Sequence, residues 1–180
     1  AKGIELRVHP TLIPDEELIA NVNGVKNAVL VQANAVGPTL YYGAGAGAGP
    51  TASAVVADVV DIVRDIIYTE DGAGTIPQLA FEALSDLPIL SSDEMTTGYY
   101  LRINAEDQTG VLADVTTILS RLGIGIDAIM QQPRLKDLIP IVILTDPIQE
   151  SKMNEAIAKI QALSFVHGEA VRIRLELLDN

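Results

Sequence analysis

The sequence predicts an α/β chain of the α+β kind, in which a small sheet with a glycine-rich loop and a helix is followed by a βαββαβ unit. Three observations support this class. Residues 1–69 combine short alternating segments with one long helical stretch, residues 70–97 lose periodicity, and residues 98–180 alternate regularly between strand and helix patterns. With 48% hydrophobic and 20% charged residues, the chain has enough apolar side chains for one or two cores.

The first part opens with three short strand patterns. Residues 4–9 alternate apolar and polar side chains as a half-buried strand does, and residues 10–20 form an irregular crossing segment. Residues 27–33 and 39–42 predict two more strands, each preceded by a turn. Because the chain opens directly on a strand without a neighbour, we expect these pieces to belong to the sheet of a longer protein.

A glycine-rich loop connects these strands to a long helix. Glycine and alanine alternate over residues 43–49, and Pro50 is suited to the first helical position, where its missing N–H costs nothing. One face of the predicted helix is apolar, with Ala52, Val55, Val56, Val59, Val63 and Ile66. Residues 70–97 then hold several glycines and prolines, which indicates a linker that ends near Thr97.

The second part has the periodicity of a complete small domain. Strands are predicted at residues 99–105, 124–132, 138–145 and 170–177, with helices at 111–122 and 148–163. Asp146, Pro147 and Gln149 predict the start of the second helix, with Gln149 completing a reciprocal cap. The resulting order, βαββαβ, is that of a ferredoxin-like split βαβ unit.

Composition excludes several classes of function. A net charge of −12 would repel a phosphate backbone, so no nucleic-acid partner is expected. No apolar stretch is long enough to span a bilayer, and the absence of cysteine fits a soluble, cytoplasmic protein. His9 and His167 have no companions at ligand spacing, so no metal site is expected either.

This chain resembles two known families. The motifs YYLR (residues 99–102), DQTGVLAD (107–114) and GIGIDAI (123–129) resemble an ACT domain, the amino-acid-binding regulatory module of many metabolic enzymes. The motifs RVHPTLI (7–13), VNGVKNA (22–28) and GAGAGAGPTASAVVAD (43–58) resemble the end of the catalytic region of homoserine dehydrogenase. The resemblance implies a division into residues 1–69 from the catalytic domain, 70–97 as linker and 98–180 as ACT domain.

The resemblance also implies an activity. Homoserine dehydrogenases interconvert L-homoserine and L-aspartate 4-semialdehyde by hydride transfer with NADP or NAD, in the route to threonine and methionine. Their nucleotide-binding half and catalytic lysine precede the matched region, so no catalytic residue is expected here and the chain alone should be inactive. The alternative is a free-standing amino-acid-binding regulatory protein without catalysis. A homo-oligomer is expected in either case, because the first strands lack neighbours.

Two sets of site residues follow from the resemblance. The glycine loop implies a cofactor contact at Gly47, with Gly45 and Gly49 beside it, although the same glycines could serve only to dock the helix on a neighbouring domain. The turn after the first ACT strand implies an amino-acid effector site, with threonine expected, formed by Asp107, Thr109, Gly110, Val111 and Leu112. Alternatively, Asp107 and Thr109 only cap the following helix. Ile126 and Asp127 are weaker candidates for the effector.

Overall fold

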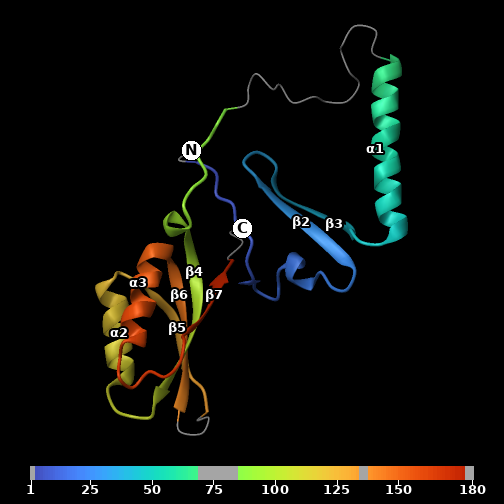
Figure 1. Ribbon diagram of the computed structural model, residues 1–180. Helices are drawn as coiled ribbons and strands as arrows, with labels where there is room; N and C mark the ends of the chain where they lie inside the picture. Colours follow the sequence, from blue (N-terminus) through green and yellow to red (C-terminus); the bar gives the residue numbers. More distant parts are fainter. Residues whose placement is uncertain (1–2, 69–84, 134–137, 177–180) are drawn as a thin grey trace. The chain divides into compact units, whose positions relative to one another are not determined.

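The computed structural model describes residues 3–68, 85–133 and 138–176 (Figure 1). Among these, the residues up to Pro14 and from Leu87 onward form one compact unit, which we call the C-terminal unit. The residues from Asp15 to Asp86 form a second, which we call the middle unit. No helix in these three described stretches is long and apolar enough to cross a membrane.

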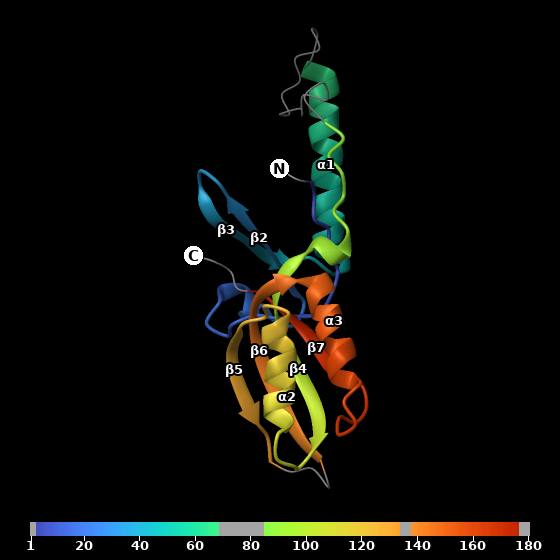
Figure 2. The ribbon, with the colours of Figure 1, turned by 90° about the vertical axis from the view of Figure 1, so that its left-hand side faces the viewer.

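The C-terminal unit is a five-stranded sheet with two helices. Its elements are β1 (Thr11–Leu12), the 3₁₀ turn η3 (Ser92–Glu94), β4 (Thr96–Glu106), α2 (Val111–Arg121), β5 (Ile126–Gln131), β6 (Leu138–Gln149), α3 (Glu150–Gln161) and β7 (Val171–Leu175). The strand order is β1-β7-β4-β6-β5, with β1 parallel to β7 and every other pair antiparallel. Both helices lie on the same face of the sheet (Figures 1 and 2). The predicted mixed class with a βαββαβ unit is confirmed.

The core lies between the sheet and its two helices. Alternate residues of β4 point toward the helices, and Tyr99, Leu101 and Ala105 have no exposed surface. Val115 of α2 and Met153 of α3 meet them from the helical side and are equally buried. Burying each aliphatic side chain contributes about 1.5 to 3 kcal/mol. The main apolar core of the unit therefore lies on the helical side of the sheet.

The first strand differs from the prediction. Residues 4–9 do not form a strand, and only Ile4 makes an isolated bridge, to Ile89. The strand begins at Thr11, where the chain reaches the free edge of β7 and pairs with Arg174 and Leu175. The Thr11 hydroxyl also donates to the Arg174 carbonyl at 3.0 Å. The alternation of apolar and polar residues therefore indicated a segment that can join a sheet. Which residues pair is decided by where the chain meets a free strand edge.

The start of α3 also differs from the prediction. The strand β6 continues through Asp146 and Pro147 to Gln149, because Ile148 and Gln149 pair with the first two residues of β4. The helix begins at Glu150, and Gln149 occupies the cap position without a side-chain hydrogen bond. The capping signal at Asp146 was therefore wrong, since sheet pairing keeps this backbone extended.

The middle unit contains a hairpin and one long helix. Its elements are η1 (Leu18–Asn21), β2 (Lys26–Ala33), β3 (Gly37–Ala44) and α1 (Ala48–Tyr68). Strands β2 and β3 pair antiparallel from Lys26 with Ala44 to Ala33 with Gly37, which confirms both predicted strands and extends them. The apolar side of α1 is exposed along its length, with Val55 56%, Val59 53% and Ile66 73% accessible. A hairpin and a helix of this kind need further packing to be stable.

Candidate functional site

The glycine loop is shorter than its sequence suggests. Gly43 and Ala44 belong to β3, and α1 already begins at Ala48, so the loop proper is residues 45–47. Pro50 is consequently the third helical residue rather than the first, which still lies in the first turn, where a backbone N–H has no intrahelical partner. The Thr51 N–H donates to the Gly47 carbonyl at 3.1 Å and closes this turn.

The three glycines proposed for the cofactor have different structural reasons to be glycine. Gly47 has φ 121°, which side chains rarely adopt. A Cβ on Gly45 would collide with the amide nitrogen of Asn27, whose side chain packs against the loop. Gly49 lies inside α1 with φ in the ordinary range and no atom within 4 Å of a Cβ, so it leaves open space beside the first turn.

The start of α1 can accept an anion. Its first turn carries no acidic side chain, and the backbone N–H groups there have no intrahelical acceptors. The positive end of the helix dipole favours a phosphate or carboxylate at this point. The missing side chains at Gly47 and Gly49 let such a group approach the backbone closely.

The turn between β4 and α2 presents backbone rather than side chains at the helix start. Gly110 is the N-cap of α2 with φ 96°, and its carbonyl accepts from Asp114 N–H at 2.9 Å. The N-cap residue is therefore Gly110, without a side-chain cap hydrogen bond, rather than Asp107 or Thr109. A Cβ on Gly110 would meet nothing within 4 Å, so there is open space over the first turn of α2.

The five predicted effector residues fall into two groups. Asp107, Thr109 and Gly110 are exposed on the turn. Val111 is 5% exposed and belongs to the core, and Leu112 packs against that core, so both can offer only backbone atoms to a ligand. The structure therefore brings together exposed polar groups and free helix N–H donors within a single turn.

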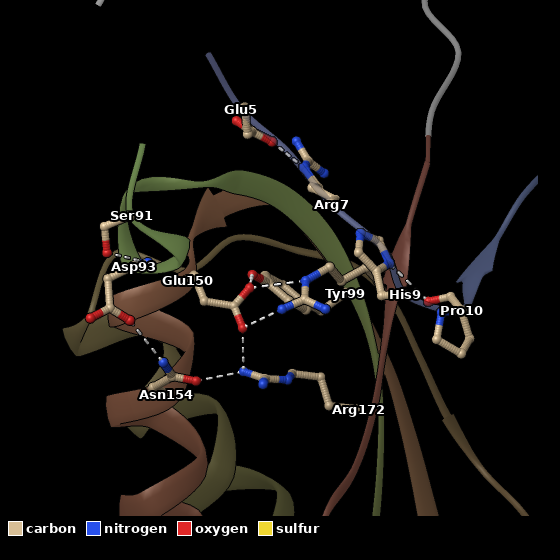
Figure 3. Close-up of polar contacts among 11 residues, drawn as sticks. Glu5, Arg7, His9, Pro10, Ser91, Asp93, Tyr99, Glu150, Asn154 and Arg172 are labelled. Carbon is tan, nitrogen blue, oxygen red and sulfur yellow. Dashed lines mark hydrogen bonds and ion pairs between the residues drawn. The ribbon is translucent and has the colours of Figure 1, made fainter. Parts of the chain in front are cut away.

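A buried carboxylate network lies at the start of α3 (Figure 3). Glu150 is 3% exposed and accepts a hydrogen bond from the Tyr99 hydroxyl at 2.6 Å. Arg174 donates to both of its oxygens, from Nε at 3.0 Å and Nη2 at 2.7 Å, and Arg172 lies 3.1 Å from Oε1. Arg172 also donates to Asn154 at 2.6 Å.

The protonation of this network follows from its surroundings. Burial alone would raise the pKa of Glu150, but the hydrogen bonds from Tyr99 and Arg174 and the charges of the two arginines outweigh burial and hold that pKa below its ordinary value of 4.5. Burial, followed by the hydrogen bond to Glu150 and its charge, raises the pKa of the Tyr99 hydroxyl well above the usual range. At neutral pH the site is a carboxylate held by a neutral phenol and two guanidinium groups.

Comparison with known proteins finds similarity to homoserine dehydrogenases across both units. Residues 1–60 match the family model for homoserine dehydrogenase, and residues 99–162 match that for the ACT domain. The chain is 55% identical to a homoserine dehydrogenase of Pseudomonas aeruginosa over 98% of its own length, and 49% identical to that of Neisseria gonorrhoeae, also over 98%. The crystal structure of a homoserine dehydrogenase from Thiobacillus denitrificans superimposes with a TM-score of 0.88 at 55% identity, over 99% of this chain.

The chain matches the C-terminal region of homoserine dehydrogenases, and the matched region includes an ACT domain. It spans 41% of the length of the two curated relatives and 40% of the crystallised chain. The resemblance stated from the sequence is therefore confirmed for both units.

The ACT domain also shows which residues sequence reasoning missed. His167 Nε2 lies 2.8 Å from Glu106 Oε1, beside the turn predicted to bind the effector, and the His167 backbone N–H donates to the Asn104 carbonyl at 2.9 Å. The network of Glu150 with Arg172 and Arg174 was also missed. Its only signal in the sequence is a glutamate near a helix start and two arginines spaced by one residue in a strand, which is also typical of solvent-facing positions.

The two weaker effector candidates both lie on β5. Ile126 packs against the core and Asp127 is exposed on β5. Among the described residues, no group of three or more acidic, histidine or cysteine side chains could hold a metal ion.

Proposed function

We propose that this chain is the regulatory and partly catalytic C-terminal region of an oxidoreductase that interconverts L-homoserine and L-aspartate 4-semialdehyde with NADP or NAD. The observation that supports this most strongly is the continuous similarity to homoserine dehydrogenases over 98% of the chain, across both units. We divide the chain into a catalytic-domain part (1–69), a linker (70–97) and an ACT domain (98–180), in cytoplasmic homo-oligomers. The catalytic groups lie outside these residues, so the chain alone is expected to be inactive.

The glycine loop is proposed to contact the cofactor. The nicotinamide cofactor supplies the hydride chemistry. The chain's own contribution is to let the ligand approach the backbone at Gly47, with Gly45 and Gly49 beside it, and to direct the N–H groups of α1 toward its negative charge.

The ACT domain is proposed to bind threonine at residues 107–112. The unpaired N–H groups in the first turn of α2 suit the carboxylate of an amino acid, and the Asp107 carboxylate on the same turn suits its ammonium group. Open space over Gly110 leaves room for the ligand. Threonine binding would then shift the enzyme between two states that differ in affinity for it.

The effector site can be tested by calorimetric titration of the chain with threonine, serine, methionine and isoleucine. We expect threonine to bind, and Gly110→Leu to weaken its binding at least tenfold by filling the space over the turn. Gly123→Leu is the matched control, because Gly123 also has a positive φ, 70°, with no atom within 4 Å of a Cβ, but lies after the other end of α2. Equal titration curves for both variants would show that the site lies elsewhere, and absence of threonine binding by the wild type would exclude this effector.

A further inference from the structure

A cavity of about 520 Å³ lies on the face of the ACT sheet that carries no helix. Its floor is formed by side chains from three neighbouring strands. Tyr100 of β4 pairs with Leu144 of β6, and Val142 of β6 pairs with Met130 of β5. Val142 is only 4% exposed although it lies outside the helical core, so this face has an apolar interior of its own.

The wall of the cavity comes from the other end of the chain. After β1 pairs with β7, residues 12–14 border the cavity beside Leu175. All of these residues belong to the C-terminal unit, so the cavity is formed within one compact body. The volume and the mainly apolar lining are typical of small-molecule sites.

Charge is confined to one end of the cavity. Among the described residues that line it, the charged ones are Asp127 and Asp146, and none is basic. Asp127 lies on β5 and Asp146 on the neighbouring β6, on either side of the Ile126–Thr145 pair. The Asp146 carboxylate occupies the space where a Cβ on Gly125 would lie, so a glycine at that position gives it room.

We propose that this cavity binds an apolar molecule that ends in an ammonium group. The apolar floor takes the hydrocarbon part, and the acidic end pairs with the cation. A free amino acid is disfavoured because no side chain in the described part of the lining can neutralise its carboxylate. The site is therefore different in chemistry from the threonine site proposed at residues 107–112, and it does not depend on that proposal.

Such a ligand would hold the N-terminal segment on the ACT sheet. It touches both the strands and residues 12–14, which continue directly into the middle unit at Asp15. Because the ligand binds only when these parts are together, it stabilises their association and raises the unfolding temperature of the C-terminal unit.

The test uses n-hexylamine as the probe, with hexanoate and hexanol as probes of the same length. Binding to the 180-residue chain is followed by calorimetry and by the chemical shift of the Met130 methyl group. We expect hexylamine to move that signal and to bind at least tenfold more tightly than hexanoate. Double substitution Asp127→Asn and Asp146→Asn should weaken hexylamine binding at least threefold and leave hexanol binding unchanged. Leu144→Trp, which fills the cavity, should abolish binding of both hexylamine and hexanol.

The control is Asp114→Asn, an exposed carboxylate on α2, on the other face of the sheet. It should bind hexylamine as the wild type does. Three results would overturn the proposal: no shift of the Met130 signal, equal affinities for hexylamine and hexanoate, or equal losses in the double variant and the control. Because the asparagine substitutions keep side-chain volume, they separate loss of charge from loss of folding.

Discussion

Glu150 has a position that ionised side chains rarely take. A carboxylate removed from water loses several kcal/mol of hydration, which only close partners can offset. Here a phenol and two guanidinium groups provide that compensation, and the Glu150 N–H donates to the Met95 carbonyl at 2.8 Å. The residue therefore fixes the start of α3 against the segment that leads into β4.

We predict that Glu150→Gln lowers the free energy of unfolding by about 3 kcal/mol at pH 7, because it leaves two partly buried arginines without their counter-charge. Glu155→Gln is the control, since Glu155 pairs with Lys159 at the surface and both side chains are 52% exposed. Its effect should stay within about 0.5 kcal/mol. Urea denaturation measures both, and equal effects would contradict the role given to Glu150.

The wild type and the Glu150→Gln variant also differ in how their stability depends on pH. The pKa of Glu150 is lower in the folded chain than its ordinary value of 4.5, so its stabilising effect is complete above that pH and is lost as the pH falls through the folded pKa. The stability difference between wild type and Glu150→Gln should therefore shrink below pH 4.5. A constant difference down to pH 2 would show that ionisation of Glu150 does not contribute.

The glycines of the loop differ in what a side chain would cost. We predict that, in the complete enzyme, Gly47→Val raises the KM for the cofactor at least tenfold, because it strains a backbone with φ 121° and blocks the approach to α1. Gly43→Ala should change this KM less than threefold, since Gly43 lies in β3 before the loop and an added Cβ meets no atom there. Steady-state kinetics with the reduced cofactor as the varied substrate measures both values.

At the scale of elements, the order βαββαβ could be predicted because each strand and helix of the ACT domain has its own periodicity of apolar residues. The strand β1 could not, because two residues carry no period and its partner β7 lies some 160 positions later in the sequence. The start of α3 was misplaced for a related reason. The signal at Asp146 is local, whereas the pairing of Gln149 with Thr96 that overrides it is not.

The candidate site and the Glu150 network were also only partly predictable from the sequence. The turn proposed for the effector was singled out by its motif, but the assignment of Gly110 as the cap required the backbone angle. The burial of Glu150 depends on Arg172 and Arg174, more than twenty residues away, and on Tyr99, fifty-one away. Sequence spacing alone cannot show that these side chains meet.

We predict that a chain shortened to residues 87–180 folds but is less stable than the full chain by about 1 to 2 kcal/mol. It loses β1, with the bonds from Thr11 to the Arg174 carbonyl and from Glu176 to the Leu12 carbonyl, each worth about 1 kcal/mol net. Thermal unfolding, followed by the near-ultraviolet signal of the C-terminal unit, measures the difference. Identical unfolding curves would show that β1 contributes nothing to this sheet.

For the molecule as a whole, the exposed apolar side of α1 favours association. Val55, Val59 and Ile66 are each more than half exposed, and contiguous apolar surface of this kind usually marks an interface. We predict that the 180-residue chain is a homo-oligomer at high micromolar concentration. Val59→Glu, at the centre of that side, should shift it toward the monomer, whereas Asp61→Asn on the polar side should not. A monomer mass for the wild type by light scattering would contradict this.

The pairing of β1 with β7 has a practical meaning for anyone who wishes to transfer this regulatory module to another enzyme. Cutting before Leu87 would give one continuous segment, yet it would leave behind the strand that covers the edge of β7 and the residues that form one wall of the cavity. A faithful graft must carry two pieces of sequence, residues 3–14 and the segment from Leu87 onward, and the recipient must join them at two points. The middle unit therefore interrupts the C-terminal unit in the sequence, and this discontinuity limits its exchange between proteins.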